Sequence, residues 1–358
     1  MKKTNNKNLN PYFSICIPQY NRTDFLLKAL ESFSRQTFTN FEVCIYDDNS
    51  NDDGMEKILN YLENSALSYC YFRSKSNGRY DASLRGAIGL SNGRYVFLMG
   101  NDDGLADCKT LELIHNHIKQ FNDISVVITN YIELTTGEQV MRVAKTKSYG
   151  EGACVASSLF RNYAFVSGII LKGEAARGLS TDKLDGSEMY QMYLATSIVS
   201  SGGQALGIED ICIQKDLQIP GQEVDSYKTQ NTASKCFFKA IELPMARIFE
   251  VISAGLSDVH DPKKKEKYLF SIANQLYKYT YPYWIIEYRR VRTWCYSFSV
   301  YRGLNPLVIC GRIHQFPFYL KSRLFMRYVI MGVVGFLIPI FIFDKVRPML
   351  FRAAKKNL

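Results

Sequence analysis

The sequence lacks the short motifs that most directly identify a cofactor or a metal class. It contains 4 His among 358 residues, and its 9 Cys form no CxxC pair and no Cys/His cluster with the spacing of a zinc site. The sequence contains no GxGxxG and no GxxxxGK[ST], so it has neither the fingerprint of a dinucleotide-binding site nor a phosphate-binding P-loop. Scattered cysteines of this kind are typical of reduced cytosolic proteins, where they pack as small apolar side chains.

The chain also lacks internal repeats and low-complexity tracts. Residues 1–10 are polar and have no apolar core of the kind that a secretory signal needs, so we expect a disordered N-terminus and no secretion. The apolar run 328–343 holds sixteen uncharged residues, whereas a membrane-spanning helix needs about 20. Pro339 and two glycines within that run weaken a spanning helix further.

What the sequence has in excess is positive charge and apolar side chains. Apolar residues make up 47% of the chain, which excludes a disordered protein, and the net charge is +10. A positive balance suits anionic partners such as nucleic acid, nucleotide phosphates or an anionic membrane surface. The length is too great for one ordinary core and indicates a domain with an appendage.

One stretch organises the first half of the chain. Residues 95–99 form a short apolar run that stops at a polar turn, 100–104, which holds Asp102 and Asp103. The run predicts a buried strand. Two carboxylates this close repel each other unless a cation or a shared proton intervenes, and Mg²⁺ or Mn²⁺ bound to carboxylate and phosphate oxygens is the natural solution. The alternative is an ordinary surface turn, because Asn, Asp and Gly favour turns for backbone reasons alone.

Strands and helices alternate before this turn. One strand is predicted at 67–72, and three more, each followed by a polar turn, are predicted at 13–17, 41–46 and 95–99, with Pro18 expected to end the strand 13–17. Such alternation with short links predicts an α/β domain with a mostly parallel sheet flanked by helices. Polar turns follow these strands at 18–22, 47–50 and 100–104. They would therefore share one edge of the sheet and build one crevice, where open α/β sheets bind ligands.

The composition changes near residue 215. We expect residues 216–320 to form a helical extension and residues 321–358 to form a basic and apolar tail. Basic residues lie on both sides of the run 328–343, which fits a segment lying in, or dipping into, an anionic cytoplasmic leaflet. The alternative is a buried helix in a helical domain or in a dimer interface.

Three ordered motifs carry a resemblance to a known family. They are FSICIPQYNR at 13–22, FEVCIYDDNS at 41–50 and FLMGNDD at 97–103. In order and spacing they resemble the family 2 glycosyltransferases of the GT-A fold, a Rossmann-like α/β fold, over residues 11–215. The acidic motif, with Asn77 and Asp81 upstream, is most similar to that of bacterial O-antigen sugar transferases, including the abequosyltransferase-like branch.

The sequence departs from the family pattern at two points. Gly100 stands where many members have the first Asp, so a metal would be held by fewer carboxylates. The Gln-x-x-Arg-Trp signature of processive synthases is absent. Its absence favours the addition of one sugar over polymerisation.

The resemblance implies roles for particular residues. The nucleotide pocket would be lined by Pro18, Tyr20, Arg22, Asp48, Asn77 and Asp81, with Asp48 on the base or ribose. Asp102 and Asp103 would hold Mg²⁺ or Mn²⁺ on the diphosphate. Inverting members use a carboxylate base at a helix start, and here Glu188 is the candidate, with Asp185 in reserve. The alternative for Glu188 is ordinary compensation of a helix dipole.

The implied activity is inverting, metal-dependent transfer of a single sugar from a nucleotide-sugar donor. The acceptor would be a lipid-linked saccharide at the cytoplasmic face of the inner membrane, where the protein would be peripheral or shallowly inserted. A metal ion stabilises the leaving diphosphate without proton transfer, and a carboxylate takes the proton of the acceptor hydroxyl. A covalent route would need a second carboxylate as nucleophile.

Two other classes compete with this interpretation. A nucleotidyltransferase acting on a sugar phosphate also uses a carboxylate-bound metal, but it needs a Gly-rich basic loop after the first strand, and residues 18–22 do not form one. A basic nucleic-acid-binding protein would interleave its charges with aromatic side chains over one surface. Here the most concentrated basic run flanks an apolar segment instead, so we expect no nucleic-acid partner.

Overall fold

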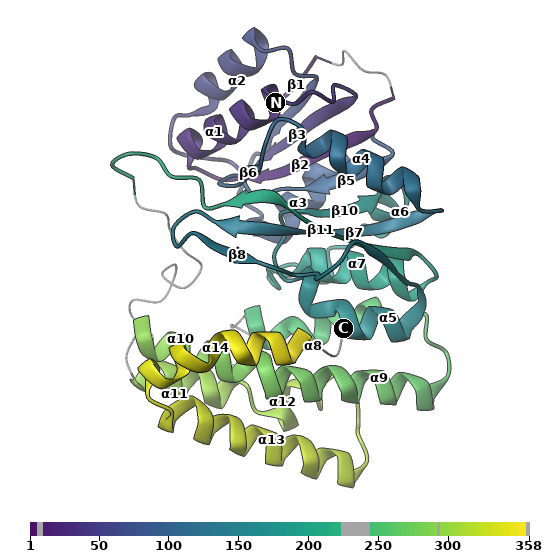
Figure 1. The fold of residues 1–358 in the computed structure, drawn as a ribbon, viewed down its shortest axis with the longest axis vertical. Coiled ribbons are helices and arrows are strands. Elements are labelled where there is room, and N and C mark those ends of the chain that lie inside the picture. The colour runs from purple at the N-terminus through teal and green to yellow at the C-terminus, as the bar shows by residue number, and fades with distance from the viewer. Residues whose placement is uncertain (6–9, 223–243, 292–293, 356–358) are drawn as a thin grey trace. The chain divides into compact units, whose positions relative to one another are not determined.

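The computed structural model describes residues 1–5, 10–222, 244–291 and 294–355 (Figure 1). The chain forms two compact units. The first comprises residues 1–156 and 160–224, and the second comprises residues 157–159 and 225–358. The expected boundary at residue 215 therefore falls inside the first unit.

The first unit is built on one 11-stranded sheet with the order β1-β4-β3-β2-β5-β10-β7-β11-β6, to which β8 adds on β7 and β9 on β11. The strands are β1 (Lys2–Asn5), β2 (Phe13–Gln19), β3 (Phe41–Asp47), β4 (Tyr69–Arg73), β5 (Tyr95–Leu98), β6 (Gly104–Leu105), β7 (Ile124–Glu133), β8 (Glu138–Val140), β9 (Lys147–Gly150), β10 (Ile169–Lys172) and β11 (Gln204–Lys215). The central strands are buried almost throughout, as expected for a sheet covered on both faces.

Helices occupy the links between these strands. They are α1 (Thr23–Ser34), α2 (Met55–Asn64), α3 (Arg79–Gly89), α4 (Thr110–Gln120), α5 (Gly152–Leu159), α6 (Gly173–Gly178) and α7 (Tyr190–Ser200), with a 3₁₀ turn at Phe160–Tyr163. In α1 the buried side chains of Phe25, Leu26, Ala29, Leu30 and Phe33 follow helical spacing. The alternation of strand and helix that the sequence predicts is thus confirmed as far as β5.

The prediction of a mostly parallel sheet is wrong, because the sheet is mixed. Strands β4, β3, β2, β5, β7 and β11 run in one direction, whereas β1, β6, β8, β9 and β10 run in the other. Strand β10 is reversed because the chain enters it at the carboxyl end of β5, where the Gly168 amide donates to the Leu98 carbonyl at 3.2 Å. The hairpin from β7 to β8 replaces the crossover that a parallel arrangement needs.

Two local expectations are also corrected. Residues 2–5 are not disordered but form β1, which pairs with β4, while residues 6–9 lie outside the described residues. Strand β2 does not end at Pro18 but continues to Gln19. A proline is tolerated there because β2 pairs with β5 only as far as Cys16, so its missing N–H interrupts no ladder on that side.

The second unit is helical in the part that the structure describes. Its helices are α8 (Pro244–Gly255), α9 (Pro262–Gln275), α10 (Tyr281–Val291), α11 (Trp294–Gly303), α12 (Pro306–Ile309), α13 (Phe318–Leu337) and α14 (Ile340–Lys355), with a π-helical turn at Leu276–Thr280. Buried aromatic side chains such as Tyr277 and Tyr281 fill its core. The helical extension expected over 216–320 is therefore present from residue 244 onward, and residues 223–243 lie outside the described residues.

The apolar run 328–343 is divided between two helices. Helix α13 ends at Leu337 and α14 begins at Ile340, with Pro339 in the break. Among the described residues, no single helix has the length and hydropathy of a membrane span; the pair Phe318–Leu337 and Ile340–Arg347, bent by 111°, passes that test when taken together.

Candidate functional site

The ends of three parallel strands meet as the sequence predicts. Strand β2 pairs in parallel with both β3 and β5. Just beyond these strands, the Asp48 amide donates to the Gln19 carbonyl at 2.8 Å, and the Asn101 side-chain amide donates to Gln19 Oε1 at 2.9 Å. The turns that follow β2, β3 and β5 are therefore connected by hydrogen bonds at one edge of the sheet.

A fourth strand end, that of β11, adds a carboxylate to the predicted pair. Asp216 directly follows β11, and its amide donates to Asp103 Oδ1 at 3.0 Å. The next amide, of Leu217, donates to the Asp102 carbonyl at 2.8 Å. One carboxylate oxygen from each of Asp102, Asp103 and Asp216 lies within 4.8 Å of the other two. We call these three residues the acidic cluster.

Asp103 is the most buried member of the acidic cluster. Its side chain is 2% exposed, and it accepts a hydrogen bond from the Ser167 hydroxyl. Ser167 in turn accepts from the Gly100 amide at 2.8 Å, so it holds both ends of the acidic turn. Burial, together with the negative charge of Asp102, raises the pKa of Asp103 to about 8. Without a bound cation, this carboxyl group therefore carries a proton through most of the neutral range.

The acidic cluster fits a hard divalent cation. It offers only oxygen ligands, which Mg²⁺ and Mn²⁺ prefer over zinc-type nitrogen and sulfur sets. A cation would also remove the repulsion that raises the pKa of Asp103. A Cβ at Gly100 would lie 2.9 Å from Asp103 Oδ2 and 3.0 Å from Asp102 Oδ1. Glycine at position 100 thus leaves room for the carboxylates of Asp102 and Asp103. Asp216 supplies a third carboxylate, which makes up for the Asp that many family members have where this chain has Gly100.

Sequence reasoning missed Asp216 because the expected domain boundary fell one residue before it. The signal was nevertheless present, since Asp216 is an acidic residue at the end of an apolar strand, like Asp102 and Asp103. Burial raises the pKa of Asp216, while the ammonium group of Lys215 opposes that shift. Lys215 also binds Glu133 at 2.7 Å.

Arg22 brings a positive charge to the acidic cluster. Its Nη1 donates to Asp102 Oδ2 at 2.8 Å, and its guanidinium lies 4.6 Å from the centre of the Phe25 ring. Its other terminal nitrogen, Nη2, is buried and has no hydrogen-bond acceptor among the described residues. The backbone of Arg22 is left-handed, with φ of 58°, which is uncommon for a residue with a side chain. A buried donor without an acceptor indicates a place for an anionic ligand.

Of the other predicted nucleotide residues, Asp48 and Asn77 hold the start of α3. The buried Asp48 carboxylate accepts from the amides of Gly78 and Arg79, each at 2.8 Å, and Asn77 Oδ1 accepts from the Arg79 amide at 3.0 Å. Burial raises the pKa of Asp48. Pro18 is half-buried in β2, and Tyr20 is exposed beyond it.

Asp81 lies in the first turn of α3, and its side chain contacts the start of α7. Its carboxylate is 1% exposed and accepts hydrogen bonds from the amides of Glu188 at 2.8 Å and Tyr190 at 3.2 Å and from the Ser187 hydroxyl at 3.2 Å. It therefore acts as a remote N-terminal cap and fixes the backbone of the candidate base.

We expect Asp81→Ala to lower the free energy of unfolding by about 1–3 kcal/mol, because the buried Tyr190 amide and the part-buried Glu188 amide lose their acceptor. Urea unfolding of the full chain measures this loss. The matched control is Asn77→Ala, which removes one exposed hydrogen bond and should change stability by less than about 0.5 kcal/mol. Equal stability of the two variants would contradict the capping role.

The two candidate bases differ in their surroundings. Asp185 forms a two-pronged ion pair with Arg85, in which Nη2 donates to Oδ2 at 2.9 Å. Glu188 lies two residues before α7, its side chain is 23% exposed, and Arg79 Nη2 lies 3.8 Å from Oε1. The φ of Glu188 is 57°, and such unusual backbone often accompanies functional sites.

The negative charges of Glu188 and Asp103 both raise the pKa of the Tyr80 phenol. Tyr80 donates a hydrogen bond to Gln191 Oε1 at 3.2 Å. Its pKa lies well above the usual value, chiefly because of burial and further because of the negative charges of Asp81, Glu188 and Asp103. The candidate base and the acidic cluster therefore both contribute negative charge that disfavours ionisation of the Tyr80 phenol.

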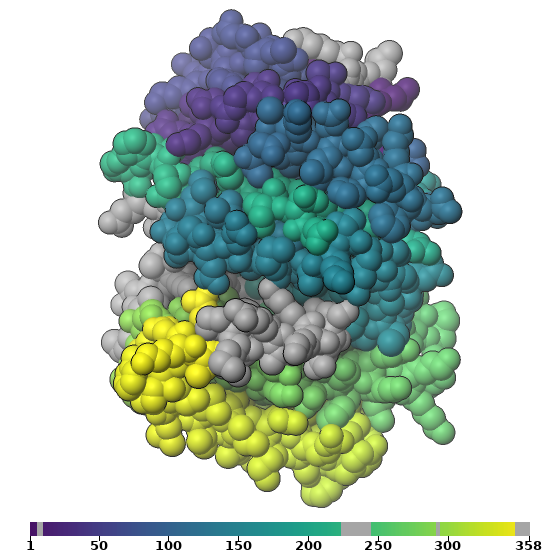
Figure 2. All heavy atoms as spheres, viewed as in Figure 1, coloured from purple at the N-terminus to yellow at the C-terminus, as the bar shows by residue number. Residues whose placement is uncertain are grey.

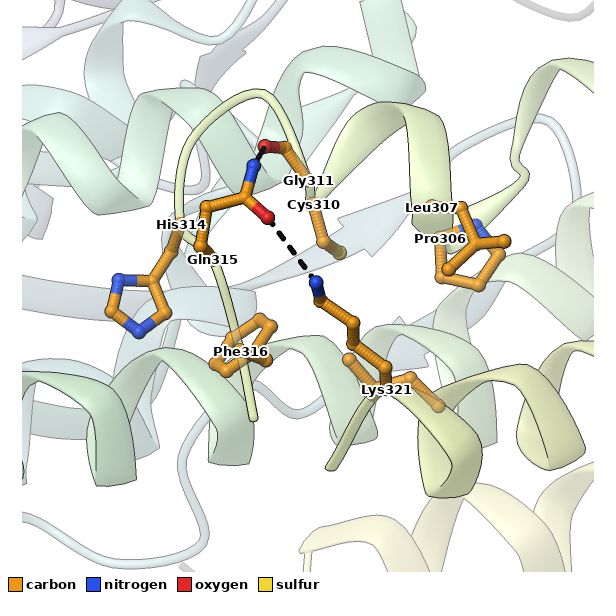
Figure 3. A pocket seen from close by; sticks show the side chains of 9 residues that line it. Pro306, Leu307, Cys310, Gly311, His314, Gln315, Phe316 and Lys321 are labelled. Atoms are coloured by element: carbon orange, nitrogen blue, oxygen red, sulfur yellow. Dashed lines mark hydrogen bonds between the residues drawn. The ribbon is translucent and has the colours of Figure 1, made fainter. Parts of the chain in front are cut away.

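A cavity in the second unit does not belong to this site. It has a volume of about 220 Å³, and its lining consists of Pro306, Leu307, Cys310, Gly311, His314, Gln315, Phe316, Lys321 and Leu324 (Figure 3). Lys321 donates to Gln315 Oε1 at 3.2 Å within it. The lining includes no carboxylate, so it offers nothing that resembles the acidic cluster.

The fold is that of GT-A glycosyltransferases, as the comparison with solved structures shows. The structure of S. aureus TarS 1-349 superimposes with a TM-score of 0.59 at 15% identity, over 90% of each chain. The mannosyltransferase PcManGT from Pyrobaculum calidifontis, solved with GDP-Man and Mn²⁺, gives a TM-score of 0.52 at 14% identity, over 93% of this chain and 88% of that one.

The sequence comparisons narrow this class to a family. Residues 14–165 match the family described as Glycosyl transferase family 2, so the first unit carries a domain of that family. Abequosyltransferase RfbV of Salmonella typhimurium is 32% identical over 114 residues, which is 31% of this chain and 34% of RfbV. Amylovoran biosynthesis glycosyltransferase AmsB of Erwinia amylovora is 27% identical over 177 residues, 48% of this chain and 58% of AmsB. The chain thus spans less than two thirds of each relative.

Proposed function

We propose that this protein transfers a single sugar from a nucleotide-sugar donor to a saccharide acceptor during synthesis of a cell-surface polysaccharide. The observation that carries the proposal is the acidic cluster beside the buried, acceptor-free Nη2 of Arg22. Relatives named as an abequosyltransferase and as an amylovoran biosynthesis enzyme support the sugar-transfer chemistry. TarS has been solved with UDP-GlcNAc, which supports a nucleotide-sugar donor.

Asp102, Asp103 and Asp216 would hold Mg²⁺ or Mn²⁺. When bound, the cation supplies positive charge against the diphosphate that leaves as the glycosidic bond breaks. Arg22 adds its own positive charge from the chain beside the acidic cluster, which favours the phosphate oxygens of the donor. Its contact with Asp102 fixes the guanidinium before the donor arrives, so little ordering is needed on binding.

Glu188 acts on the acceptor side. A sugar hydroxyl is a poor nucleophile, and a carboxylate within hydrogen-bond reach accepts its proton as the new bond forms. Asp185 is the weaker candidate because both of its oxygens are engaged by Arg85. One displacement assisted by one base inverts the configuration of the anomeric carbon, whereas retention through a covalent intermediate needs a carboxylate nucleophile as well.

The two competing classes have less support. The family 2 domain favours sugar transfer over nucleotidyl transfer and over nucleic-acid binding. We further propose that the acceptor is lipid-linked and that the protein works at the cytoplasmic face of the inner membrane. The exposed surface of the second unit, described below, supports this location.

Thermal unfolding of the full chain with nucleoside diphosphates tests the donor site. We expect UDP, GDP, CDP or dTDP to stabilise the protein in the presence of Mn²⁺ and to lose most of that effect in EDTA. Ligand at a hundred times its Kd contributes about 2.7 kcal/mol. Asp216→Asn should weaken the Mn²⁺-dependent part, whereas Glu56→Gln, at an exposed carboxylate on α2, should not. No response to any nucleotide would contradict the proposal.

A further inference from the structure

Exposed large apolar side chains gather on the second unit. Among the described residues, all but Met1 and Tyr20 lie between Trp294 and Ile342. A soluble surface rarely exposes so many apolar side chains together unless the surface has a partner. Nothing in the sugar-transfer chemistry of the first unit uses them.

Helix α13 carries most of these side chains, and both of its faces are apolar. The inward face consists of Leu320, Leu324, Tyr328, Met331, Gly332 and Gly335. The outer face consists of Phe318, Tyr319, Phe325, Met326, Val329, Ile330, Val333 and Leu337, which are between 41% and 86% exposed. The second half of α13, residues 328–337, is apolar on every side, which is typical of a helix with an apolar medium on its outer face. Figure 2 shows the yellow-green atoms of α13 at the surface.

The neighbouring helix α11 extends the outer face of α13. The exposed ring of Trp294 stacks on Phe336 of α13, with 5.5 Å between ring centres. The exposed ring of Phe298 lies 6.2 Å from the same ring. The apolar surface is therefore continuous across two helices, and Trp is a residue that favours the interface between water and lipid.

Most charged residues in the sequence that carries this surface are positive. Residues 288–343 contain no Asp and no Glu but eight Arg or Lys residues. On α13 itself, Arg323 is exposed and Arg327 is half-buried. Long basic side chains can lie along apolar surface and place their charge at lipid headgroups. Two copies of this chain would bring like charges together if they paired through this face, which disfavours a homodimer there.

The break between α13 and α14 is held in place by α10. Arg289 Nη1 donates to the Gly335 carbonyl at 2.6 Å and to the Ile338 carbonyl at 3.1 Å, which are acceptors at the end of α13. Arg290 pairs with Asp344 near the start of α14. A straight spanning helix would have to give up these contacts. The bent pair therefore suits a surface position better than a transmembrane one.

We propose that the outer face of α13, together with Trp294 and Phe298, docks in the plane of an anionic membrane. The apolar side chains enter the boundary between headgroups and acyl chains, and the basic residues bind anionic headgroups. This inference deepens the membrane location in the proposed function by naming the surface that binds lipid, and its test is independent of sugar transfer because binding to lipid requires neither donor nor metal.

Sedimentation of the full chain with lipid vesicles tests the inference. Vesicles of phosphatidylcholine mixed with phosphatidylglycerol should pellet the protein, phosphatidylcholine alone should bind it more weakly, and added salt should reduce the difference. Met326→Ser combined with Ile330→Ser should weaken binding about tenfold or more on both kinds of vesicle, because two exposed apolar side chains are lost. Arg323→Gln combined with Arg327→Gln should weaken binding about tenfold on the anionic vesicles only.

The matched control is Lys263→Gln combined with Lys264→Gln. It removes two exposed positive charges from α9 of the same unit and should change binding by no more than about twofold. Circular dichroism checks that each variant is folded. Absence of wild-type binding to anionic vesicles would overturn the inference, and so would equal losses in the control and the α13 variants. A dimer that Met326→Ser and Ile330→Ser dissociate, without vesicle binding, would assign the face to a protein interface instead.

Discussion

Asp103→Asn should abolish metal-dependent sugar transfer while leaving the first unit folded. Asp103 is the buried centre of the acidic cluster, and asparagine keeps its shape but removes the charge that a divalent cation needs. Loss of one preorganised electrostatic group typically costs about a hundredfold to a thousandfold in rate. Initial rates with Mn²⁺ and a nucleotide-sugar donor measure the effect. Asp102→Asn should behave similarly and should also free Arg22 from its ion pair.

The pH dependence follows from the raised pKa of Asp103, about 8. A cation must displace the proton from this carboxyl group, so metal affinity should rise about tenfold per pH unit below pH 8 and then level off. In the metal-free protein the folded state holds that proton more tightly than the unfolded chain, where an Asp titrates near about 4. Stability without metal should therefore fall as pH rises from about 4 to about 8, and Asp103→Asn should flatten this dependence.

Controls separate a metal role from a structural one. Glu56→Gln removes an exposed carboxylate on α2 and should leave both rate and Mn²⁺ affinity unchanged. Titration calorimetry with Mn²⁺ and UDP reports binding apart from turnover. Full activity in EDTA, together with an active Asp102→Asn and Asp103→Asn double variant, would remove the metal from the mechanism.

The strand ends at the site could be predicted because their signals are local. Each of β2, β3 and β5 is a short apolar run followed by a polar turn, and parallel pairing places the three turns at one edge. The direction of β10 could not be predicted, because it depends on where the chain re-enters the sheet rather than on the pattern of its own residues. The prediction that Pro18 ends β2 was wrong for a related reason, because the effect of a proline depends on whether a neighbouring strand pairs with β2 at that point.

Several aspartates support the backbone of distant helix starts through long-range hydrogen bonds, and the sequence does not reveal these roles. Asp52 accepts from the amide and hydroxyl of Thr23 at 3.0 and 2.7 Å and so caps α1 from another loop. Asp48 and Asp81 hold the starts of α3 and α7 in the same way. In sequence these residues are simply acidic groups in turns, and only the fold distinguishes those that support backbone from those that face a ligand.

Glu188→Gln should reduce turnover by about a hundredfold to ten-thousandfold, the usual range for loss of a general base. Glutamine keeps the size of the side chain, but its amide cannot take the proton of an acceptor hydroxyl. The Glu188 amide is held by Asp81, and its φ of 57° sets the backbone apart from an ordinary helix start. Nucleotide binding should survive, because the acidic cluster and Arg22 are unchanged by this substitution.

Asp185→Asn provides the matched comparison for Glu188→Gln. It removes a carboxylate three residues away that is engaged by Arg85, so it should change the rate only mildly while lowering stability. Single-turnover rates with saturating donor, together with UDP titrations, separate a loss of chemistry from a loss of binding. An active Glu188→Gln beside an inactive Asp185→Asn would transfer the role to Asp185. If both variants stay active, the base lies elsewhere in the chain, and the strained backbone at Glu188 serves only to connect Asp81 with α7.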